Sequence, residues 1–271
     1  MQSPDSGCGL RAFDRAESCR DADRLRSKRE APVLHRGLAL TLALCAAPAA
    51  AQEVDVDVEL VFATDGSGSI DDEELRLQRE GYAKALADPR VQQAIRGGIT
   101  GRIAVAFVEW GGADSQHVIV DWTVIDGADS AAAFGAALAA APRRATGWNS
   151  ISNAIGLSVR LIEGNDHQGL RKVIDISADA GQRGGRPLPE VRAEALAAGI
   201  TINGLAVLSR SGRPGWGGGS LEDFFRAQVI GGPGAFVITA DADARFTEAV
   251  VRKLVLEIAE RPADAAPMPP G

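Results

Sequence analysis

Cysteine and histidine are scarce in this 271-residue sequence, and this scarcity excludes several kinds of site. The three cysteines, Cys8, Cys19 and Cys45, all lie in the first fifty residues. The rest of the chain therefore has no disulfide framework, thiolate metal site or cysteine nucleophile. Beyond Cys45 the sequence contains two histidines, His117 and His167. A conventional serine hydrolase, which needs a histidine beside its serine, is not expected.

Positive charge is also in short supply, because 29 Lys and Arg residues face 36 Asp and Glu residues, giving a formal net charge of −7. Nucleic acids are bound through clustered Lys and Arg side chains, so this balance disfavours a nucleic acid as the partner. Aromatic residues make up 5% of the chain, but hydrophobic residues make up 45%. That is enough to build the core of a large α/β domain.

The apolar segment GLALTLALCAAPAAAQ, at 37–52, ends in small residues. This pattern is typical of a secretory signal peptide, and the segment is short for a membrane span. We predict a signal peptide over 33–51, preceded by a non-native or disordered extension over 1–32. The mature bacterial protein is then periplasmic or secreted and has no stable membrane span. We expect one domain over 52–261 and a disordered Pro- and Ala-rich tail over 262–271.

From residue 54 onward, strand-like and helix-like segments alternate. Apolar runs predict strands at 56–64, 102–110, 116–122, 171–179, 200–208 and 235–240. Amphipathic segments predict helices at 71–88, 129–141, 150–163, 188–199, 220–230 and 243–260. The short link between the second and third strands predicts an antiparallel hairpin. The sequence thus predicts an α/β fold with a doubly wound, mostly parallel central sheet, one antiparallel edge strand and helices on both faces.

Ligands of such sheets bind at the carboxyl ends of the strands, where the first strand is followed by DGSGSID at 65–71. This is not a phosphate loop, because Asp71 stands where the third glycine is needed and three more carboxylates follow it. The serines do not fit the G-x-S-x-G spacing of a hydrolase nucleophile. A calcium-binding EF-hand loop would need glycine and glutamate where the chain has Ile70 and Arg76.

Asp65, Ser67 and Ser69 remain as a carboxylate and two hydroxyls in the pattern D-x-S-x-S. Their oxygens are the hard ligands that a cation such as Mg²⁺ prefers. The spacing alone leaves a second interpretation open. In that interpretation the serines cap the following helix and Asp65 closes a turn.

The line VELVFATDGSGSID, at 58–71, resembles the first strand and metal loop of von Willebrand factor type A domains, which have a Rossmann-like fold. In that family D-x-S-x-S forms the metal-ion-dependent adhesion site (MIDAS). The resemblance implies Asp65, Ser67 and Ser69 as ligands of Mg²⁺, Mn²⁺ or Ca²⁺. It also implies Asp179 as the aspartate of the third metal loop, because KVIDISADAG at 172–181 resembles the family's strand that ends in T-D-G. In place of the family's threonine, the line ATGWNSISNAI at 145–155 offers Asn149 or Ser150.

The whole segment 54–260 resembles an uncharacterised bacterial family of exported type A domains, for instance in GRIAVAFVEWGG and VIGGPGAFV. The resemblance implies a non-enzymatic protein-binding module for adhesion or scaffolding, whose partner offers an acidic residue. Two alternatives stay open. One is a metal-assisted hydrolase, although no general base is evident near the loop. The other is a type A domain that has lost its metal and assembles without it, which Asn149 and the divergent SADAGQR segment favour.

Four further residues have predicted roles around the metal loop. Asp175 lies in an apolar strand, where a buried carboxylate needs a partner. We expect it to orient the metal loop without touching the ion, or to accept backbone hydrogen bonds. Arg210, Arg213 and Trp216 lie in a glycine-rich loop that follows a strand. Arg and Trp are frequent in binding hot spots, so these three are predicted to bind the partner; the alternative is a surface loop without a role.

Overall fold

The computed structural model describes residues 54–208, 219–241 and 245–259. The predicted signal peptide, the extension before it and the tail over 262–271 lie outside the described residues. The same holds for Arg210, Arg213 and Trp216. Their predicted roles remain predictions.

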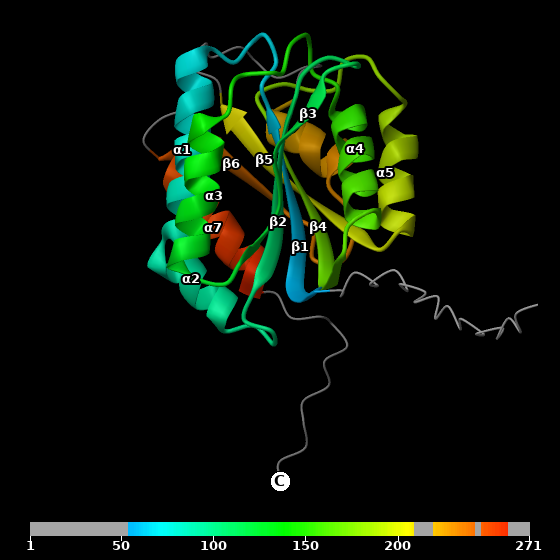
Figure 1. Ribbon diagram of the computed structural model, residues 1–271. Coiled ribbons are helices and arrows are strands. Elements are labelled where there is room, and N and C mark those ends of the chain that lie inside the picture. Colours follow the sequence, from blue (N-terminus) through cyan, green and yellow to red (C-terminus); the bar gives the residue numbers. More distant parts are fainter. Residues whose placement is uncertain (1–53, 209–218, 242–244, 260–271) are drawn as a thin grey trace, which may run out of the picture. The chain divides into compact units, whose positions relative to one another are not determined.

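A six-stranded sheet forms the centre of the domain, in the order β3-β2-β1-β4-β5-β6. Neighbouring strands are parallel except for β2 and β3, which pair in antiparallel fashion and place β3 at an edge (Figure 1). This arrangement confirms the predicted fold class, including the antiparallel hairpin. The strands are β1 (Val54–Asp65), β2 (Ile103–Trp110), β3 (Gln116–Ile125), β4 (His167–Ala178), β5 (Ile200–Leu208) and β6 (Val237–Asp241).

Helices cover both faces of the sheet (Figure 1). One face carries α1 (Asp72–Ala87), α2 (Pro89–Arg96), α3 (Ala128–Ala140) and α7 (Phe246–Ala259). The other carries α4 (Ile151–Glu163), α5 (Leu188–Ala197) and α6 (Leu221–Phe224), which continues as a π-helical turn over Phe225–Val229. The prediction missed α2 as a separate helix. Asp88 caps it by accepting a hydrogen bond from the backbone N–H of Arg90, and Pro89 occupies the position where proline suits a helix start.

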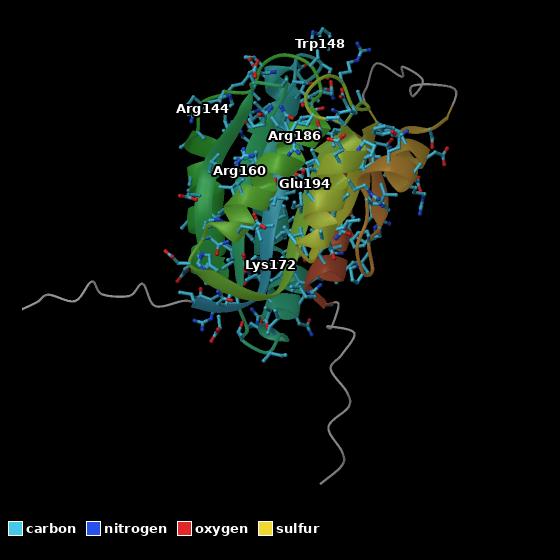
Figure 2. The ribbon with its side chains drawn as sticks, turned by 90° about the vertical axis from the view of Figure 1, so that its right-hand side faces the viewer. Arg144, Trp148, Arg160, Lys172, Arg186 and Glu194 are labelled. Atoms are coloured by element: carbon cyan, nitrogen blue, oxygen red, sulfur yellow. The ribbon has the colours of Figure 1, made fainter. Side chains whose placement is uncertain are left out.

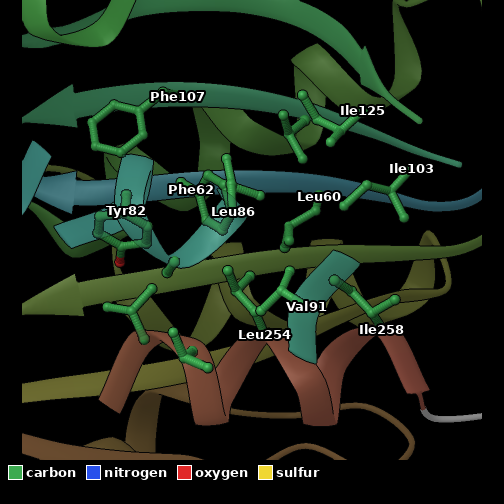
Figure 3. Packing of buried hydrophobic residues seen from close by; sticks show 14 of the residues in the cluster. Leu60, Phe62, Tyr82, Leu86, Val91, Ile103, Phe107, Ile125, Leu254 and Ile258 are labelled. Carbon is green, nitrogen blue, oxygen red and sulfur yellow. The ribbon is translucent and has the colours of Figure 1, made fainter. Parts of the chain in front are cut away.

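Each face of the sheet has its own hydrophobic core, because both faces are covered. Along β1, Leu60 and Phe62 face one core, and Val61 and Ala63 face the other. Tyr82 of α1 packs at the centre of the first core, with ring centroids 4.9 Å from Phe62, 5.4 Å from Phe107 and 5.9 Å from Phe246 (Figure 3). Burial on both sides explains why the central strands read as nearly continuous apolar runs.

Candidate metal centre

The carboxyl ends of β1 and β4 bring two site segments together. These strands are parallel neighbours, and Thr64 pairs with Ser177 at their ends. The loop after β1 continues toward β2, where the N–H of Gly66 donates to the carbonyl of Trp110 at 2.8 Å. Asp71 then starts α1 with a capping box, in which its carboxylate accepts from the N–H of Glu74 at 2.8 Å. The helix therefore begins directly after the D-x-S-x-S loop.

Five of the predicted site residues form one hydrogen-bonded cluster. Asp65 accepts at Oδ1 from the N–H of Ser67 (2.8 Å) and at Oδ2 from Asn149 Nδ2 (2.7 Å). The hydroxyls of Ser67 and Ser69 lie 3.1 Å apart. Ser69 donates to Asp179 Oδ1 at 3.1 Å, and Ser67 donates to Asn149 Oδ1 at 3.4 Å. Three loops that are distant in the sequence thus meet at one point.

Asn149, rather than Ser150, is the member of this cluster from the second loop. The hydroxyl of Ser150 donates to the carbonyl of Gly184 at 3.4 Å, away from Asp65. Thr146 also turns elsewhere, since its N–H and hydroxyl both lie within hydrogen-bonding distance of Ser115 Oγ. The amide of Asn149 presents an oxygen beside Ser67 while its nitrogen is bonded to Asp65.

The cluster is buried at its base and open at its mouth. Asp65, Ser67 and Asn149 are buried, Asp179 is half-buried and Ser69 is exposed. Burial, and next the charge of Asp179, raise the pKa of Asp65 to about 7, while hydrogen bonds from Ser67 act in the opposite direction. Two carboxylates are therefore held close together at a site that desolvates one of them. A bound cation would offset both effects.

The donor set fits a cation that prefers oxygen ligands. It offers two carboxylates, two hydroxyls and one amide oxygen, which suit Mg²⁺, Mn²⁺ or Ca²⁺ better than a metal that prefers sulfur or imidazole. No group of three or more His, Cys, Asp or Glu side chains arranged to hold a metal occurs in the described part of the chain. The residues that would hold an ion here are Asp65, Ser67, Ser69, Asn149 and Asp179.

Close backbone contacts fix the second loop against the segments that follow β1 and β2. The N–H of Gly68 donates to the carbonyl of Gly147 at 2.9 Å, and the N–H of Gly112 donates to that of Thr146 at 2.7 Å. A Cβ at Gly111 would lie 2.2 Å from the Thr146 carbonyl oxygen, so this approach requires glycine. Gly147 has a φ of +84°, which favours glycine as well.

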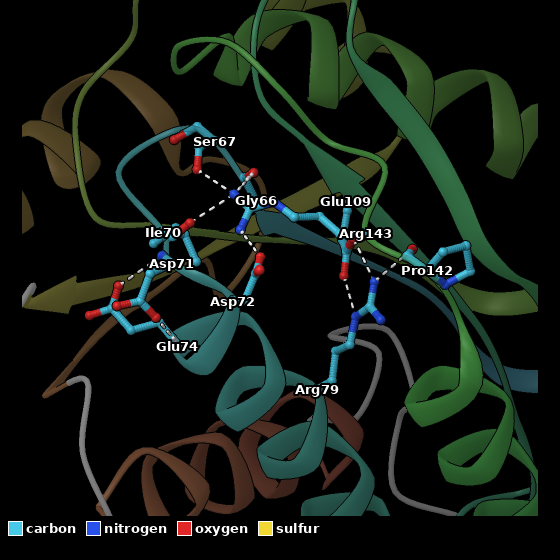
Figure 4. A network of polar contacts seen from close by, with 10 residues as sticks. All are labelled: Gly66, Ser67, Ile70, Asp71, Asp72, Glu74, Arg79, Glu109, Pro142 and Arg143. Carbon is cyan, nitrogen blue, oxygen red and sulfur yellow. Dashed lines mark hydrogen bonds and ion pairs between the residues drawn. The ribbon is translucent and has the colours of Figure 1, made fainter.

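Arg143 was not predicted to belong to the site, yet its side chain binds the backbone of the D-x-S-x-S loop (Figure 4). Its Nη2 donates to the carbonyls of Gly66 and Ser67 at 3.1 Å and of Ile70 at 2.7 Å. Its Nη1 donates to Asp72 Oδ1 at 2.8 Å. One guanidinium thus binds three backbone carbonyls of the loop that carries Ser67 and Ser69.

Arg79 fixes the segment that leads to Arg143, and it too was missed (Figure 4). It forms a buried, two-bond ion pair with Glu109 of β2, at 2.6 Å and 2.8 Å. It also donates to the carbonyls of Leu138, Ala141 and Pro142. The sequence carries one signal for it, because Arg79 falls at the inward positions of α1, four residues after Leu75.

Asp175 is buried and pairs with a lysine of the last helix. Lys253 of α7 lies 2.9 Å from its Oδ1, and Lys253 also bonds Glu257 one turn along the helix. Asn203 of β5 donates to the same Glu257 at 2.9 Å. Burial raises the pKa of Asp175 to about 7, against the opposing charge of Lys253. These contacts join β4 to α7. No hydrogen bond or ion pair between Asp175 and the 65–71 loop occurs among the described residues, and the orienting role stays a prediction.

A groove of about 900 Å³ lies at the opposite end of the sheet. Its lining includes Asp57 near the start of β1, Leu170 near the start of β4 and Ile99 after α2. It contains none of the predicted site residues. The groove is therefore separate from the cluster around Asp65.

A family comparison now adds to this geometry. Residues 55–262 match the family described as "Protein of unknown function (DUF1194)". The chain belongs to this family. A search of curated proteins finds no match. None of the helices in the described ranges is long and apolar enough to cross a membrane.

Solved structures with the same fold include two proteins of different origin. Proximal thread matrix protein 1 from the mussel byssus, described with a zinc-occupied MIDAS motif, is 16% identical with a TM-score of 0.54. The match covers 76% of this chain and 49% of that one. The pilus adhesin SpaC from Lactobacillus rhamnosus GG is 11% identical with a TM-score of 0.54, covering 75% of this chain and 31% of that one. The chain spans half or less of these proteins, and its fold is that of a von Willebrand factor type A domain, as predicted.

Proposed function

We propose that this protein is an exported protein-binding module whose binding depends on a divalent cation at a MIDAS-type site. One observation carries the proposal: Asp65, Ser67, Ser69, Asn149 and Asp179 converge in a single oxygen-rich cluster at the carboxyl edge of the sheet. The mussel protein's description, with zinc in a MIDAS motif, supports a divalent ion, and the description of SpaC as an adhesin supports a role in binding.

Mg²⁺ is the ion we favour, with Mn²⁺ or Ca²⁺ as alternatives, because all the donors are hard oxygen atoms. Two carboxylates balance the charge of a divalent ion, but the five protein donors leave one position of an octahedral ion open. A partner that presents an Asp or Glu side chain at the open mouth beside Ser69 would supply a carboxylate oxygen there. This open position, and the preference of such ions for carboxylate oxygens, are why we propose an acidic residue as the partner's main contact.

Calorimetric titration of the purified protein with Mg²⁺, Mn²⁺ and Ca²⁺ tests the proposal. We expect one site in the wild-type protein, and at least tenfold weaker binding in Asp65→Asn and Asp179→Asn, since each variant removes one of two charged donors. Asp129→Asn is the matched control, because Asp129 is exposed on α3 and outside the cluster. An absence of binding at millimolar metal, or equal binding in Asp65→Asn, would defeat the cation claim.

Metal-free assembly is the second candidate, and the Asn149 amide favours it. Its Nδ2 already bonds one carboxylate oxygen of Asp65, so the cluster closes through hydrogen bonds that need no ion. In that case the protein would capture its ligands equally well in Mg²⁺ and in EDTA. A cation-dependent module would lose capture in EDTA.

A further inference from the structure

Trp148 is a large apolar side chain that lies exposed beside the candidate metal centre. It is 61% exposed and is flanked by Gly147 and the cluster residue Asn149. Figure 2 shows it at the end of the domain toward which the parallel strands run. Single exposed apolar residues are common on protein surfaces, so exposure alone does not indicate a role.

The backbone on both sides of Trp148 is held firmly. Before it, the carbonyl of Gly147 accepts a hydrogen bond from Gly68 of the D-x-S-x-S loop, and the carbonyl of Thr146 accepts one from Gly112, which follows β2. After it, the carbonyl of Asn149 accepts from the N–H of Arg183 at 2.5 Å, and the N–H of Ser150 donates to Gly111 at 2.7 Å. The side chain is thus presented to solvent from a fixed backbone. Little chain entropy would be lost when a partner packs on it.

One arginine lies close to this side chain and a second belongs to the same loop. The guanidinium of Arg183 lies 6.0 Å from the centre of the Trp148 ring, and Arg144 is exposed four residues before Trp148. Both lie on the loops that carry Asn149 and follow Asp179. An acidic partner segment would therefore be attracted to this surface even before it reached a bound cation.

We infer that Trp148 is the apolar half of the binding surface whose other half is the cation site. The inference rests on the proposed function and names the partner's chemistry: a protein segment with an Asp or Glu and a bulky apolar side chain close to it in sequence. Trp148 is adjacent to Asn149, and an extended chain advances about 3.3 Å per residue. A carboxylate at the cluster would place a side chain about two to four residues away over the indole ring. Trp and Arg dominate binding hot spots because they bury large areas.

Selection from a phage-displayed random peptide library, in Mg²⁺ and in EDTA, tests the inference. We expect the wild-type protein to select, in Mg²⁺ only, peptides with an acidic residue and a bulky apolar residue within about four positions. Trp148→Ser should still select the acidic residue but lose the apolar preference. It should bind a wild-type-selected peptide at least about tenfold more weakly. Trp148→Phe should keep most of the preference.

Two controls separate this inference from the proposed function. Ile99→Ser removes another exposed apolar side chain, 79% exposed in the groove at the opposite end, and should select the wild-type motif. Trp148→Ser should bind Mn²⁺ within about twofold of wild type, because the indole is not part of the hydrogen-bonded cluster. If Trp148→Ser selects the same acidic and apolar motif, the inference is overturned and the proposed function stands. If wild type selects no acidic peptides, or selects them equally in EDTA, both are overturned.

Discussion

At the scale of single residues, Arg143 is the least expected part of the candidate site. It belongs to no motif, but its guanidinium binds three carbonyls of the loop between β1 and α1. Those bonds hold the carbonyls of Gly66, Ser67 and Ile70 to one guanidinium, and the segment between them carries both hydroxyls. The positions of two candidate ligands therefore depend on a residue more than seventy positions later in the sequence.

Replacing Arg143 with alanine should weaken Mn²⁺ binding about tenfold. The loop loses three hydrogen bonds to a charged donor, and its hydroxyls are then no longer held in place. Arg143→Lys should restore part of the affinity, since it returns a positive charge but fewer directed bonds. Titration calorimetry gives both values. Arg144→Ala is the matched control, and equal affinities in Arg143→Ala and wild type would contradict this role.

Gly111→Ala should destabilise the protein by about 2 kcal/mol or more. Its Cβ would overlap the backbone carbonyl of Thr146, which no side-chain movement can relieve. Gly127→Ala is the control, because a Cβ there meets nothing within 4 Å. Urea unfolding measures the stability of both variants. A Gly111→Ala variant as stable as the control would show that the segment after β2 is not in tight contact with the loop that carries Thr146.

At the scale of elements, α7 is joined to the sheet by charge as well as by apolar packing. Lys253 is fully buried between Asp175 of β4 and Glu257 of its own helix. Replacing Lys253 with methionine keeps most of the volume but leaves two buried carboxylates without their cation. We expect a loss of about 3–5 kcal/mol in the free energy of unfolding.

Arg252→Met, one residue earlier on the exposed side of α7, provides the comparison and should change stability by less than about 0.5 kcal/mol. Both variants are measured by urea unfolding. If Lys253→Met is as stable as Arg252→Met, the buried ion pair does not stabilise the junction of β4 and α7.

Asp175 should make stability depend on pH. The groups facing it are Lys253 and Glu257 of α7 and Tyr82 of α1. Folding raises its pKa from 3.8 to about 7, so the folded state holds the proton more tightly than the unfolded state. The stability that Asp175 contributes by binding this proton is therefore present below about pH 4 and is lost as the pH rises through about 7.

Asp175→Asn has no such proton to lose. The stability of wild type relative to Asp175→Asn should thus decrease between about pH 4 and pH 8, in urea unfolding with a chelator present. An increase over the same range would show that the ion pair with Lys253 outweighs the effect of burial.

The elements were largely predictable because buried strands and amphipathic helices leave strong periodic patterns. The exception is α2, which is short and follows α1 after a single residue. Its sequence is therefore easily taken for the end of α1 or for a loop. The strand β4 begins at His167, four residues before its predicted start, since its first residues are polar and pair at the exposed end of the sheet.

The residues themselves pointed to the candidate site only where they form a compact motif, as Asp65, Ser67 and Ser69 do. Asp179 lies far from that motif and was predicted from the family resemblance. The choice between Asn149 and Ser150 needed the structure, because the side chains of neighbouring residues diverge. Arg143 and Trp148 act through backbone contacts or exposure, which leave no pattern in a single sequence, whereas the one signal for Arg79 is its place at an inward position of α1.

At the scale of the whole molecule, the fold gathers the candidate site at one end of the sheet. The carboxyl ends of the parallel strands carry the oxygen cluster, the arginine that holds its loop and the exposed tryptophan. The chain as a whole has a formal charge of −7, yet Arg143, Arg144 and Arg183 lie in the loops at this end. A bound cation would add positive charge there, which favours the acidic partner we propose.

Anomalous scattering from crystals soaked in Mn²⁺ tests the central claim most directly, because it locates the ion rather than its effects. We predict one strong peak within about 2.0–2.6 Å of oxygen atoms from the cluster, Asp65, Ser67 and Ser69 among them. The same soak of Asp65→Asn crystals should show no peak there. A wild-type map without density at the cluster, with Asp65 still bonded to Ser67 and Asn149, would contradict a metal site in this protein.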